Sequence, residues 1–208
     1  MNGEIVLREY QKSDRGELVD IIRKTWNYDR FCSPKVAQKM ARVYLDSCLS
    51  NQTFTRVAVV GQTPVGIIMG KNVAAHKCSV SQRLRWMGSI ISLLSCREGR
   101  KISQVFGGVD GIDRELLSAS GKDYAGELAF FSLRDTCRGK GLGRKMFEAL
   151  VEYMRSENIP EFYLYTDTSC NFAFYEHLGM VRRCEQKKAV QVNEEVGDMT
   201  FFLYDYAC

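Results

Sequence analysis

Three glycines separate a strand-like stretch from a helix-like one in the second half of the chain. Residues 124–133 read YAGELAFFSL, and the glycines follow at positions 139, 141 and 143. Apolar residues then recur at every fourth position, at 142, 146, 150 and 154, which predicts an amphipathic helix. A strand, a glycine-rich loop and a helix in this order predict an α/β unit whose loop backbone can approach a ligand closely.

The same loop carries an excess of positive charge. Arg138, Lys140, Arg144 and Lys145 lie within eight residues, at the point where the helix begins. The helix dipole places partial positive charge at this end, so each cation there costs about 0.3–1 kcal/mol. A bound anion would offset that cost, and glycines allow backbone N–H groups to point at it. The loop is therefore predicted to hold a phosphate or pyrophosphate, with a solvated basic turn as the alternative.

Two common phosphate-binding motifs do not fit this loop. The pattern G-x-x-x-x-G-K-[ST] of nucleoside triphosphatases is absent from the sequence. The dinucleotide pattern G-x-G-x-x-G, counted from Gly139 or Gly141, requires a third glycine where Arg144 or Met146 stands. Nucleotide hydrolysis and nicotinamide or flavin chemistry therefore lose their main support.

Hydrophobic periodicity predicts one α/β domain over residues 1–208, with helices on both faces of a sheet. Residues 71–122 do not continue the regular succession of strands and helices, and they are interpreted as a helical insertion between the third and fourth strands. The expected strands are 4–10, 53–60, 65–69, 124–133, 162–166, 180–192 and 199–206, and the expected helices outside the insertion are 14–26, 33–48, 142–154 and 171–178.

The insertion concentrates the basic charge of the chain. The whole chain has a net charge of +4, whereas residues 71–101 hold seven basic residues and one acid, which gives +6. Apolar residues at 86, 87, 90, 91 and 94 are predicted to dock one face of a helix on the core and to leave the arginines outward. Three readings stay open for these arginines: a solvated face, a cationic rim that draws in an acidic acceptor, or part of a dimer contact.

Residue spacing excludes several other classes. The eight cysteines are at least 14 residues apart and only two histidines are present, so no C-x-x-C pair begins a zinc site and no metal is expected. No apolar run reaches the length of a membrane span, and the N-terminus lacks the apolar core of a signal peptide. We therefore expect a cytoplasmic protein without a membrane span. The mild net charge gives no reason to expect nucleic acid as a partner.

Two segments resemble the GNAT superfamily of N-acetyltransferases. Arg138-x-x-Gly141-x-Gly143 matches the family's acyl-CoA loop, (Q/R)-x-x-G-x-(G/A), and it stands between a strand and an amphipathic helix. Residues 171–180, NFAFYEHLGM, resemble the second motif, in which an Asn, an Ala, a Tyr and a Gly precede a hydrophobic strand. These motifs cover residues 124–180, and the order of elements extends the resemblance over 1–70 and 181–208. The insertion is not explained by it.

The resemblance implies a mixed, mostly antiparallel GNAT-like sheet, with acetyl-CoA as the cosubstrate. The acetyl group would pass to a small-molecule or peptide amine by direct attack, through a tetrahedral intermediate. Family members splay two strands beside the loop, so that backbone N–H groups bind the pantetheine arm and polarise the thioester. Independently of the resemblance, a homodimer stays open as an assembly of this chain. The residues expected to bind acetyl-CoA are Phe131, Ser132, Leu133, Arg138, Gly139, Lys140, Gly141, Leu142, Gly143, Arg144 and Asn171.

Two side chains are candidates for proton transfer. Tyr175 lies four residues after Asn171, so the two would share a helix face, and the resemblance makes Tyr175 the acid that protonates the leaving thiolate. The alternatives are a core aromatic for Tyr175 and a helix N-cap for Asn171. Glu127 is the acid within an otherwise apolar strand, and some histone-type family members carry their general base at the corresponding place. Its alternative is an edge glutamate that faces solvent.

Other functions remain compatible with parts of the sequence. A non-catalytic acyl-CoA-binding module would keep the glycine loop without needing Tyr175. A nucleic-acid or membrane-surface binder would use the basic insertion. A covalent route through Cys137, beside the loop, would need a paired base that the sequence does not supply. The presence of both the loop and Tyr175 favours the acyltransferase.

Overall fold

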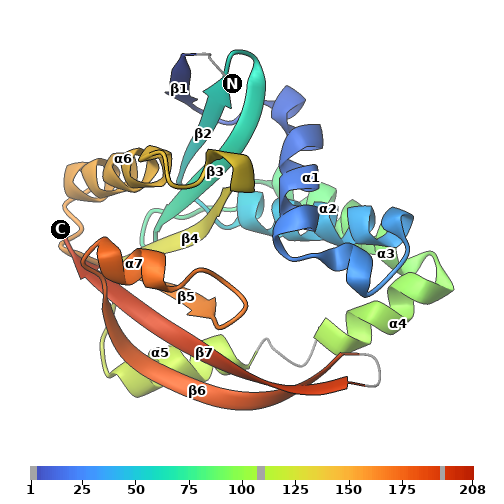
Figure 1. Ribbon diagram of the computed structural model, residues 1–208. Helices are drawn as coiled ribbons and strands as arrows, with labels where there is room; N and C mark the ends of the chain where they lie inside the picture. The colour runs from blue at the N-terminus through green and yellow to red at the C-terminus, as the bar shows by residue number, and fades with distance from the viewer. Residues whose placement is uncertain (1–3, 107–110, 193–194) are drawn as a thin grey trace.

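The computed structural model describes residues 4–106, 111–192 and 195–208, and a single sheet runs through it (Figure 1). Its strands lie in the order β1-β2-β3-β4-β5-β7-β6, and every neighbouring pair is antiparallel except β4 and β5. The expected mixed, mostly antiparallel sheet is confirmed. The strands are β1 (Ile5–Arg8), β2 (Phe54–Val60), β3 (Thr63–Asn72), β4 (Gly126–Leu133), β5 (Glu161–Asp167), β6 (Val181–Val192) and β7 (Glu195–Ala207).

Helices cover both faces of this sheet. On one face α1 (Arg15–Thr25) and α2 (Pro34–Ser50) pack over the N-terminal strands, and α5 (Ile112–Ser120) packs against β6 and β7. On the other face lie α6 (Leu142–Ser156) and the short α7 (Ala173–His177). The fourfold apolar spacing of α6 buries Leu142, Met146, Leu150 and Met154, each at most 2% exposed. Burial of that face is what holds the start of α6, and hence the glycine loop, against the sheet.

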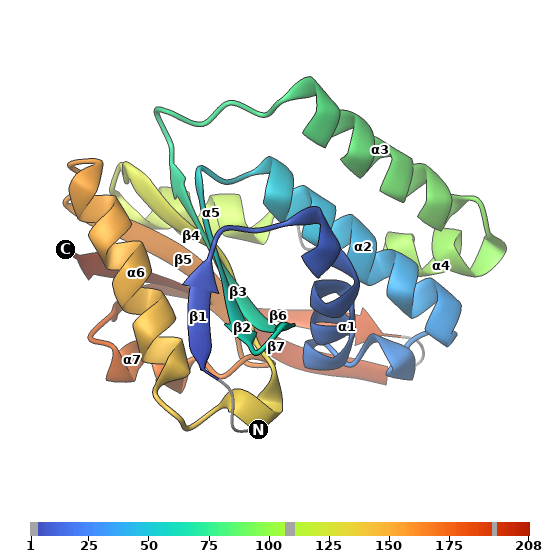
Figure 2. The ribbon, with the colours of Figure 1, turned by 90° about the horizontal axis from the view of Figure 1, so that it is seen from above.

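The segment between β3 and β4 is helical, as expected. It contains α3 (Val80–Leu94), α4 (Arg97–Phe106) and α5, although β3 itself extends to Asn72 and so includes the first residues assigned to the insertion. Helix α3 packs on the outer side of α2, with α2 between it and the sheet (Figure 2). The arginine-bearing helix thus lies on the periphery of the molecule.

The inward face of α3 differs from the one expected. Trp86 and Ile90 are half-buried as predicted, but the buried residue of the helix is Leu93. Met87, Ile91 and Leu94 face outward and are 49%, 66% and 38% exposed. The reason lies in α2, whose surface presents polar partners: Gln82 donates to the carbonyl of Leu49, and the Ser89 hydroxyl bonds the Asp46 carboxylate.

An extra residue in β4 changes which way its side chains point. Met69 pairs with Phe130 and Gly70 pairs with Leu128, so Ala129 has no partner on β3 and forms a β-bulge. Past the bulge, Phe130 packs toward α1 and α2, whereas Phe131 packs toward α6. The bulge therefore aims Phe131 at the glycine loop.

Within the described residues, none of the helices has the length and apolarity needed to cross a bilayer.

Candidate acyl-CoA site

The strands β4 and β5 part where the site begins. They pair only at Gly126 with Phe162 and at Glu127 with Tyr163, and the rest of β4 has no β5 neighbour. The N–H of Arg134 donates to the carbonyl of Val65 on β3, 2.7 Å away. Backbone groups alternate in direction along a strand, so those of Phe131 and Leu133 point to the open side. This gap is the splayed arrangement that the resemblance implied.

Ser132 contributes differently from its neighbours. By the same alternation its backbone points to β3 rather than into the gap. Its side chain instead faces α1, where its hydroxyl lies 3.2 Å from that of Thr25. The expectation that all three residues of Phe131–Leu133 offer backbone N–H groups thus applies to the first and the last of them.

The glycine loop has the backbone that glycine permits. Gly139 and Gly141 have φ values of 73° and 75°, in the left-handed region that other residues rarely adopt. Gly141 is the N-cap of α6, and no side chain caps the helix there. A Cβ placed on either glycine would meet no atom within 4 Å, so open space lies in front of the loop. The first N–H groups of α6 therefore have room for an external acceptor.

Cationic side chains surround this open helix end. Arg138 and Arg144 are exposed, as are Lys140 and Lys145. Arg138 pairs with Asp135 at 3.0 Å, and Arg144 donates to the carbonyl of His177, 3.4 Å away on α7. The predicted anion site thus consists of a helix N-terminus without a side-chain cap, surrounded by long, exposed Arg and Lys side chains. This arrangement suits a pyrophosphate.

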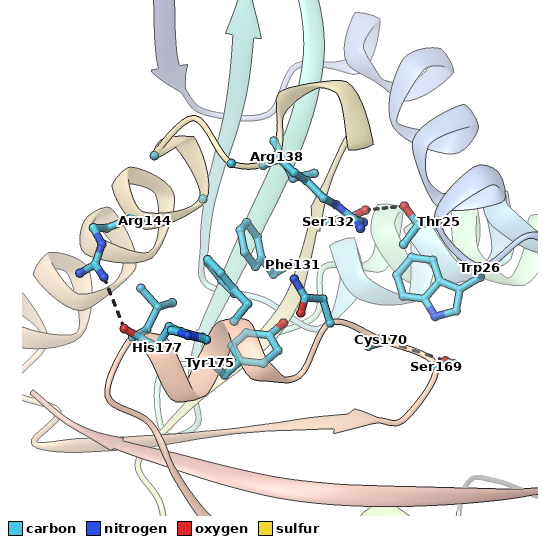
Figure 3. Close-up of a pocket in the computed structure, with 17 residues that line it drawn as sticks. Thr25, Trp26, Phe131, Ser132, Arg138, Arg144, Ser169, Cys170, Tyr175 and His177 are labelled. Atoms are coloured by element: carbon cyan, nitrogen blue, oxygen red, sulfur yellow. Dashed lines mark hydrogen bonds between the residues drawn. The ribbon is translucent and has the colours of Figure 1, made fainter.

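The gap and the loop open into one pocket of about 400 Å³. Figure 3 shows Arg144 at one side, Trp26, Ser169 and Cys170 at the other, and Phe131 and Tyr175 between them. The lining residues come from the end of α1, β4, the glycine loop, the segment after β5, and α7. They are Thr25, Trp26, Phe131, Ser132, Leu133, Arg138, Gly139, Gly141, Gly143, Arg144, Ser169, Cys170, Asn171, Phe174, Tyr175, His177 and Leu178.

Tyr175 lines this pocket while its ring is held by packing. Its ring contacts that of Phe174 at 5.5 Å between centroids, and it packs on the cluster beneath α6. Burial raises the pKa of the Tyr175 hydroxyl, and the nearby Cys170 thiol raises it further. The phenol is thus protonated at neutral pH, as a proton donor must be.

Asn171 reaches the same pocket from outside the helix. The N-cap of α7 is Phe172, so Asn171 precedes the helix and neither caps it nor shares a helical face with Tyr175. Both residues nevertheless line the pocket, because the turn at Phe172 brings them to the same side. His177, also in the lining, is bonded through Nδ1 to the carbonyl of Ala173 at 2.6 Å.

Three predicted site residues do not line the pocket. The side chain of Leu142 is 2% exposed and belongs to the core under α6, so only its backbone faces the loop. Lys140 is exposed beyond the rim. Glu127 lies at the closed end of β4, four residues before Phe131, which is about 13 Å along a strand. Its carboxylate is 3.5 Å from the Lys71 amino group, with 13% of the side chain exposed, so it is not a solvent-facing edge residue.

The sequence did not predict the residues at the end of the pocket that lies away from the glycine loop. Thr25 is the last residue of α1 and Trp26 follows it directly, whereas the sequence predicted Trp26 only as the end of the helix 14–26. The Trp26 ring stacks on the ring of Phe130, with 5.8 Å between centroids, and contacts the ring of Tyr44, with 5.1 Å between centroids. Ser169 and Cys170 precede the Asn motif directly, which was the one available signal for them. Cys137, the candidate thiol, is 5% exposed in the core and absent from the pocket lining.

The donor set fits acetyl-CoA. A pyrophosphate needs N–H donors and cations, which the loop and α6 supply, and a pantetheine arm needs backbone groups along an open strand, which β4 supplies. Among the described residues no three or more His, Cys, Asp or Glu side chains gather in a way that could hold a metal ion.

Comparisons with known proteins agree with this geometry. The family model described as the acetyltransferase (GNAT) family matches residues 17–180. No curated protein sequence matches the chain. Among solved structures, PH1933 from Pyrococcus horikoshii OT3 aligns with a TM-score of 0.61 and 15% identity, covering 99% of each chain.

Two further solved structures of this fold carry acetyltransferase names. The ribosomal-protein-alanine N-acetyltransferase from Brucella melitensis aligns with a TM-score of 0.57 and 12% identity, over 98% of this chain and 99% of that one. The PaiA N-acetyltransferase from Thermoplasma acidophilum, solved with coenzyme A, aligns with a TM-score of 0.52 and 15% identity over 99% of each chain. The matched family model spans most of the sequence, and the chain therefore belongs to the GNAT family of acetyl-CoA-dependent N-acetyltransferases.

Proposed function

We propose that this enzyme transfers the acetyl group of acetyl-CoA to a primary amine by direct attack of the amine nitrogen on the thioester carbonyl. The observation that carries the proposal is that one pocket is lined by the cationic glycine loop, by the open segment of β4 and by the Tyr175 ring. A non-catalytic binding module would need the first two features but not a protonated phenol beside them.

The glycine loop would hold the pyrophosphate, and β4 the pantetheine arm. Arg138 and Arg144 would supply positive charge, while the first N–H groups of α6 would supply directed donors. Backbone N–H groups of Phe131 and Leu133 point to the open side of β4, where they would polarise the thioester carbonyl. These donors are held in place before the substrate arrives, which is the condition under which they lower a barrier most.

Tyr175 would complete the transfer by protonating the leaving group. When the amine attacks, the C–N bond forms and the nitrogen of the tetrahedral intermediate loses its extra proton to solvent. The C–S bond then breaks, and the coenzyme leaves as a thiolate that takes the phenolic proton of Tyr175. Solvent then returns a proton to the phenolate. The raised pKa of Tyr175 keeps the phenol protonated before the reaction, and also makes the phenolate easy to reprotonate.

Glu127 would remove the proton from the incoming ammonium group through water. Its neighbours Lys71, Cys48 and Tyr163 surround it on the side of the sheet that α2 covers, the side that Ser132 also faces. Its position outside the pocket lining favours action through water over direct contact with the amine. The acceptor would enter past Thr25, Trp26, Ser169 and Cys170, at the end of the pocket away from the glycine loop.

An acceptor screen tests the proposal. The full-length enzyme is incubated with acetyl-CoA and a panel of primary amines that covers amino acids, polyamines, aminoglycosides and peptides with free N-termini. Release of the CoA thiol is followed by colour, and the product is identified by mass spectrometry, with amine-free reactions as the control. We expect thiol release that depends on an amine, matched by acetylated amine. Equal thiol release without any amine, or an acetyl group that stays on the protein, would contradict direct transfer.

A further inference from the structure

The outward face of α3 is an apolar stripe. Val80, Leu84, Met87, Ile91 and Leu94 are separated by four, three, four and three residues, so they fall on one side of the helix. All five are exposed, with values that range from 38% at Leu94 to 75% at Val80. They account for half of the large hydrophobic residues that the described structure leaves exposed.

Helix α3 differs from an ordinary surface helix, whose apolar residues face inward only. Its inward side holds the buried Leu93 and the half-buried Trp86 and Ile90, but its outward side is apolar as well. The inward side also carries polar contacts to α2. A helix that meets water on its outer face normally places its polar residues there. In α3 the outer face is apolar instead, which indicates that this face meets something other than water.

Positive charge stands at both ends of the stripe. Lys77 and Arg83 flank its N-terminal end, and Arg97, Arg100 and Lys101 follow its C-terminal end, all five exposed. Among the described residues, none of these cations has a carboxylate within 4 Å. The acid of this region, Glu98, is bonded to the backbone and hydroxyl of Ser33 and is turned toward α2.

We propose that the α3 face docks on the surface of an anionic lipid bilayer. The five apolar side chains would enter the boundary of headgroups and acyl chains, and the cations would lie at the level of the lipid phosphates. Helix α3 forms the outer edge of the molecule in Figure 2, so no neighbouring helix holds it off a flat surface. Association with a second copy is disfavoured by charge, because it would bring two faces of like sign together.

The proposal is independent of the acetyl-transfer chemistry, since none of the pocket-lining residues belongs to the insertion. Its test is flotation of the full-length enzyme with two kinds of vesicle, pure phosphatidylcholine and phosphatidylcholine with 30% phosphatidylglycerol. We expect binding to the anionic vesicles, weakened at high salt, and binding at least tenfold weaker to the neutral ones.

Two variants separate the apolar and charged contributions. The double change Leu84→Ser and Ile91→Ser should lower binding to anionic vesicles at least tenfold. The double change Arg83→Ser and Arg97→Ser should weaken it by about fivefold for each cation removed. Val181→Ser, which alters a residue of β6 that is 48% exposed, serves as the matched control and should bind like the wild type. All variants should keep their melting temperature and their CoA binding, because the altered side chains lie on the surface and outside the pocket.

Three outcomes would overturn the proposal. The first is absence of binding to anionic vesicles. The second is unchanged binding by the Leu84→Ser, Ile91→Ser variant, which would leave charge alone as the cause. The third is a dimer in sedimentation velocity that this variant abolishes, which would assign the stripe to a second copy of the chain.

Discussion

A Cβ atom added to Gly143 would lie 3.1 Å from the ring of Phe174. Gly143 belongs to the first turn of α6, and Phe174 belongs to α7, next to Tyr175. The helix that would bind the pyrophosphate therefore rests directly on the helix that would carry the proton donor. The phenyl ring of Phe131, on β4, also packs against Phe174, with 5.6 Å between the two ring centroids.

This contact predicts that Gly143→Ala shifts α7 by a few tenths of an ångström. Because a misplacement of about 1 Å lowers a reaction rate about a hundredfold, kcat/KM for acetyl-CoA should fall about tenfold. The variant Phe174→Leu removes the ring atoms that the new methyl group would meet. Combining both changes should restore part of the loss, which a double-mutant cycle would measure. Strictly additive losses in kcat/KM would show that the two residues do not act through one another.

Tyr175→Phe should lower kcat by about 10²–10⁴ while leaving CoA affinity nearly unchanged, because the hydroxyl acts on the leaving thiolate rather than in binding. Activity should also persist in alkaline solution, since the pKa of the Tyr175 hydroxyl is raised above its usual range. Tyr153→Phe is the matched control, because it removes a hydroxyl that bonds Thr53 at 2.7 Å outside the pocket. A Tyr175→Phe enzyme that retains full kcat would remove the acid role, and one that merely unfolds would leave Tyr175 as a core aromatic.

Glu127→Gln should depress kcat/KM mainly below the pKa of the acceptor amine, where the amine arrives protonated and a base is needed. Above that pKa the variant should approach the wild type. Glu161→Gln changes a carboxylate at the start of β5, which pairs with Lys122 at 3.0 Å, and should leave the pH profile unaltered. A Glu127→Gln profile that is superimposable on the wild type would assign proton removal to water or to a substrate group.

Asp205 should make the fold sensitive to acid. Burial opposes ionisation of this carboxyl, but bonds from Arg183, Lys122 and Tyr124 prevail and lower its pKa. A lowered folded-state pKa stabilises the protein above the unfolded value, about 3.9 for Asp, and this stability disappears as the pH falls through the folded-state pKa.

At neutral pH, Asp205→Asn should therefore cost about 3 kcal/mol, or about 6–12 °C in melting temperature. The measurement is thermal unfolding of the variant and the wild type between pH 7 and pH 3. The difference between them should shrink toward the acidic end of this range. A difference that is constant over the whole range would show that the carboxylate charge does not contribute.

The local backbone features of the site could be predicted from the sequence. Glycines at 139 and 141 precede a helix, and only such residues readily adopt the left-handed conformations that the structure has there. The fourfold apolar spacing of α6 and the turn at Gly179 are likewise signals carried by neighbouring residues. The anion loop and the short helix with Tyr175 were predicted for this reason.

Features that depend on distant partners could not be predicted. The bulge at Ala129 appears only when β3 and β4 pair, and it decides that Phe131 faces the loop. The inward face of α3 is set by Asp46 and the Leu49 carbonyl on α2, which a periodicity argument does not contain. Asp14 stands at the N-cap of α1, but its carboxylate accepts from Arg8 and from the N–H of Gln11 rather than from the helix.

The central claim is that the glycine loop holds the pyrophosphate of acetyl-CoA, and substitution of Gly141 tests it most directly. Asp and Asn both tolerate the positive φ of 75° at this position better than other side chains do, and they have nearly the same shape. Gly141→Asp and Gly141→Asn thus share any backbone strain and differ in one negative charge.

The measurement is the Kd for CoA by titration calorimetry, with the rise in melting temperature at saturating CoA as a second readout. At 100 times its Kd, CoA should stabilise the wild type by about 2.7 kcal/mol. We predict that Gly141→Asn retains measurable binding and that Gly141→Asp loses it, because its carboxylate would lie where the pyrophosphate charge must be. Equal CoA affinity in the wild type and the Gly141→Asp variant would contradict the claim.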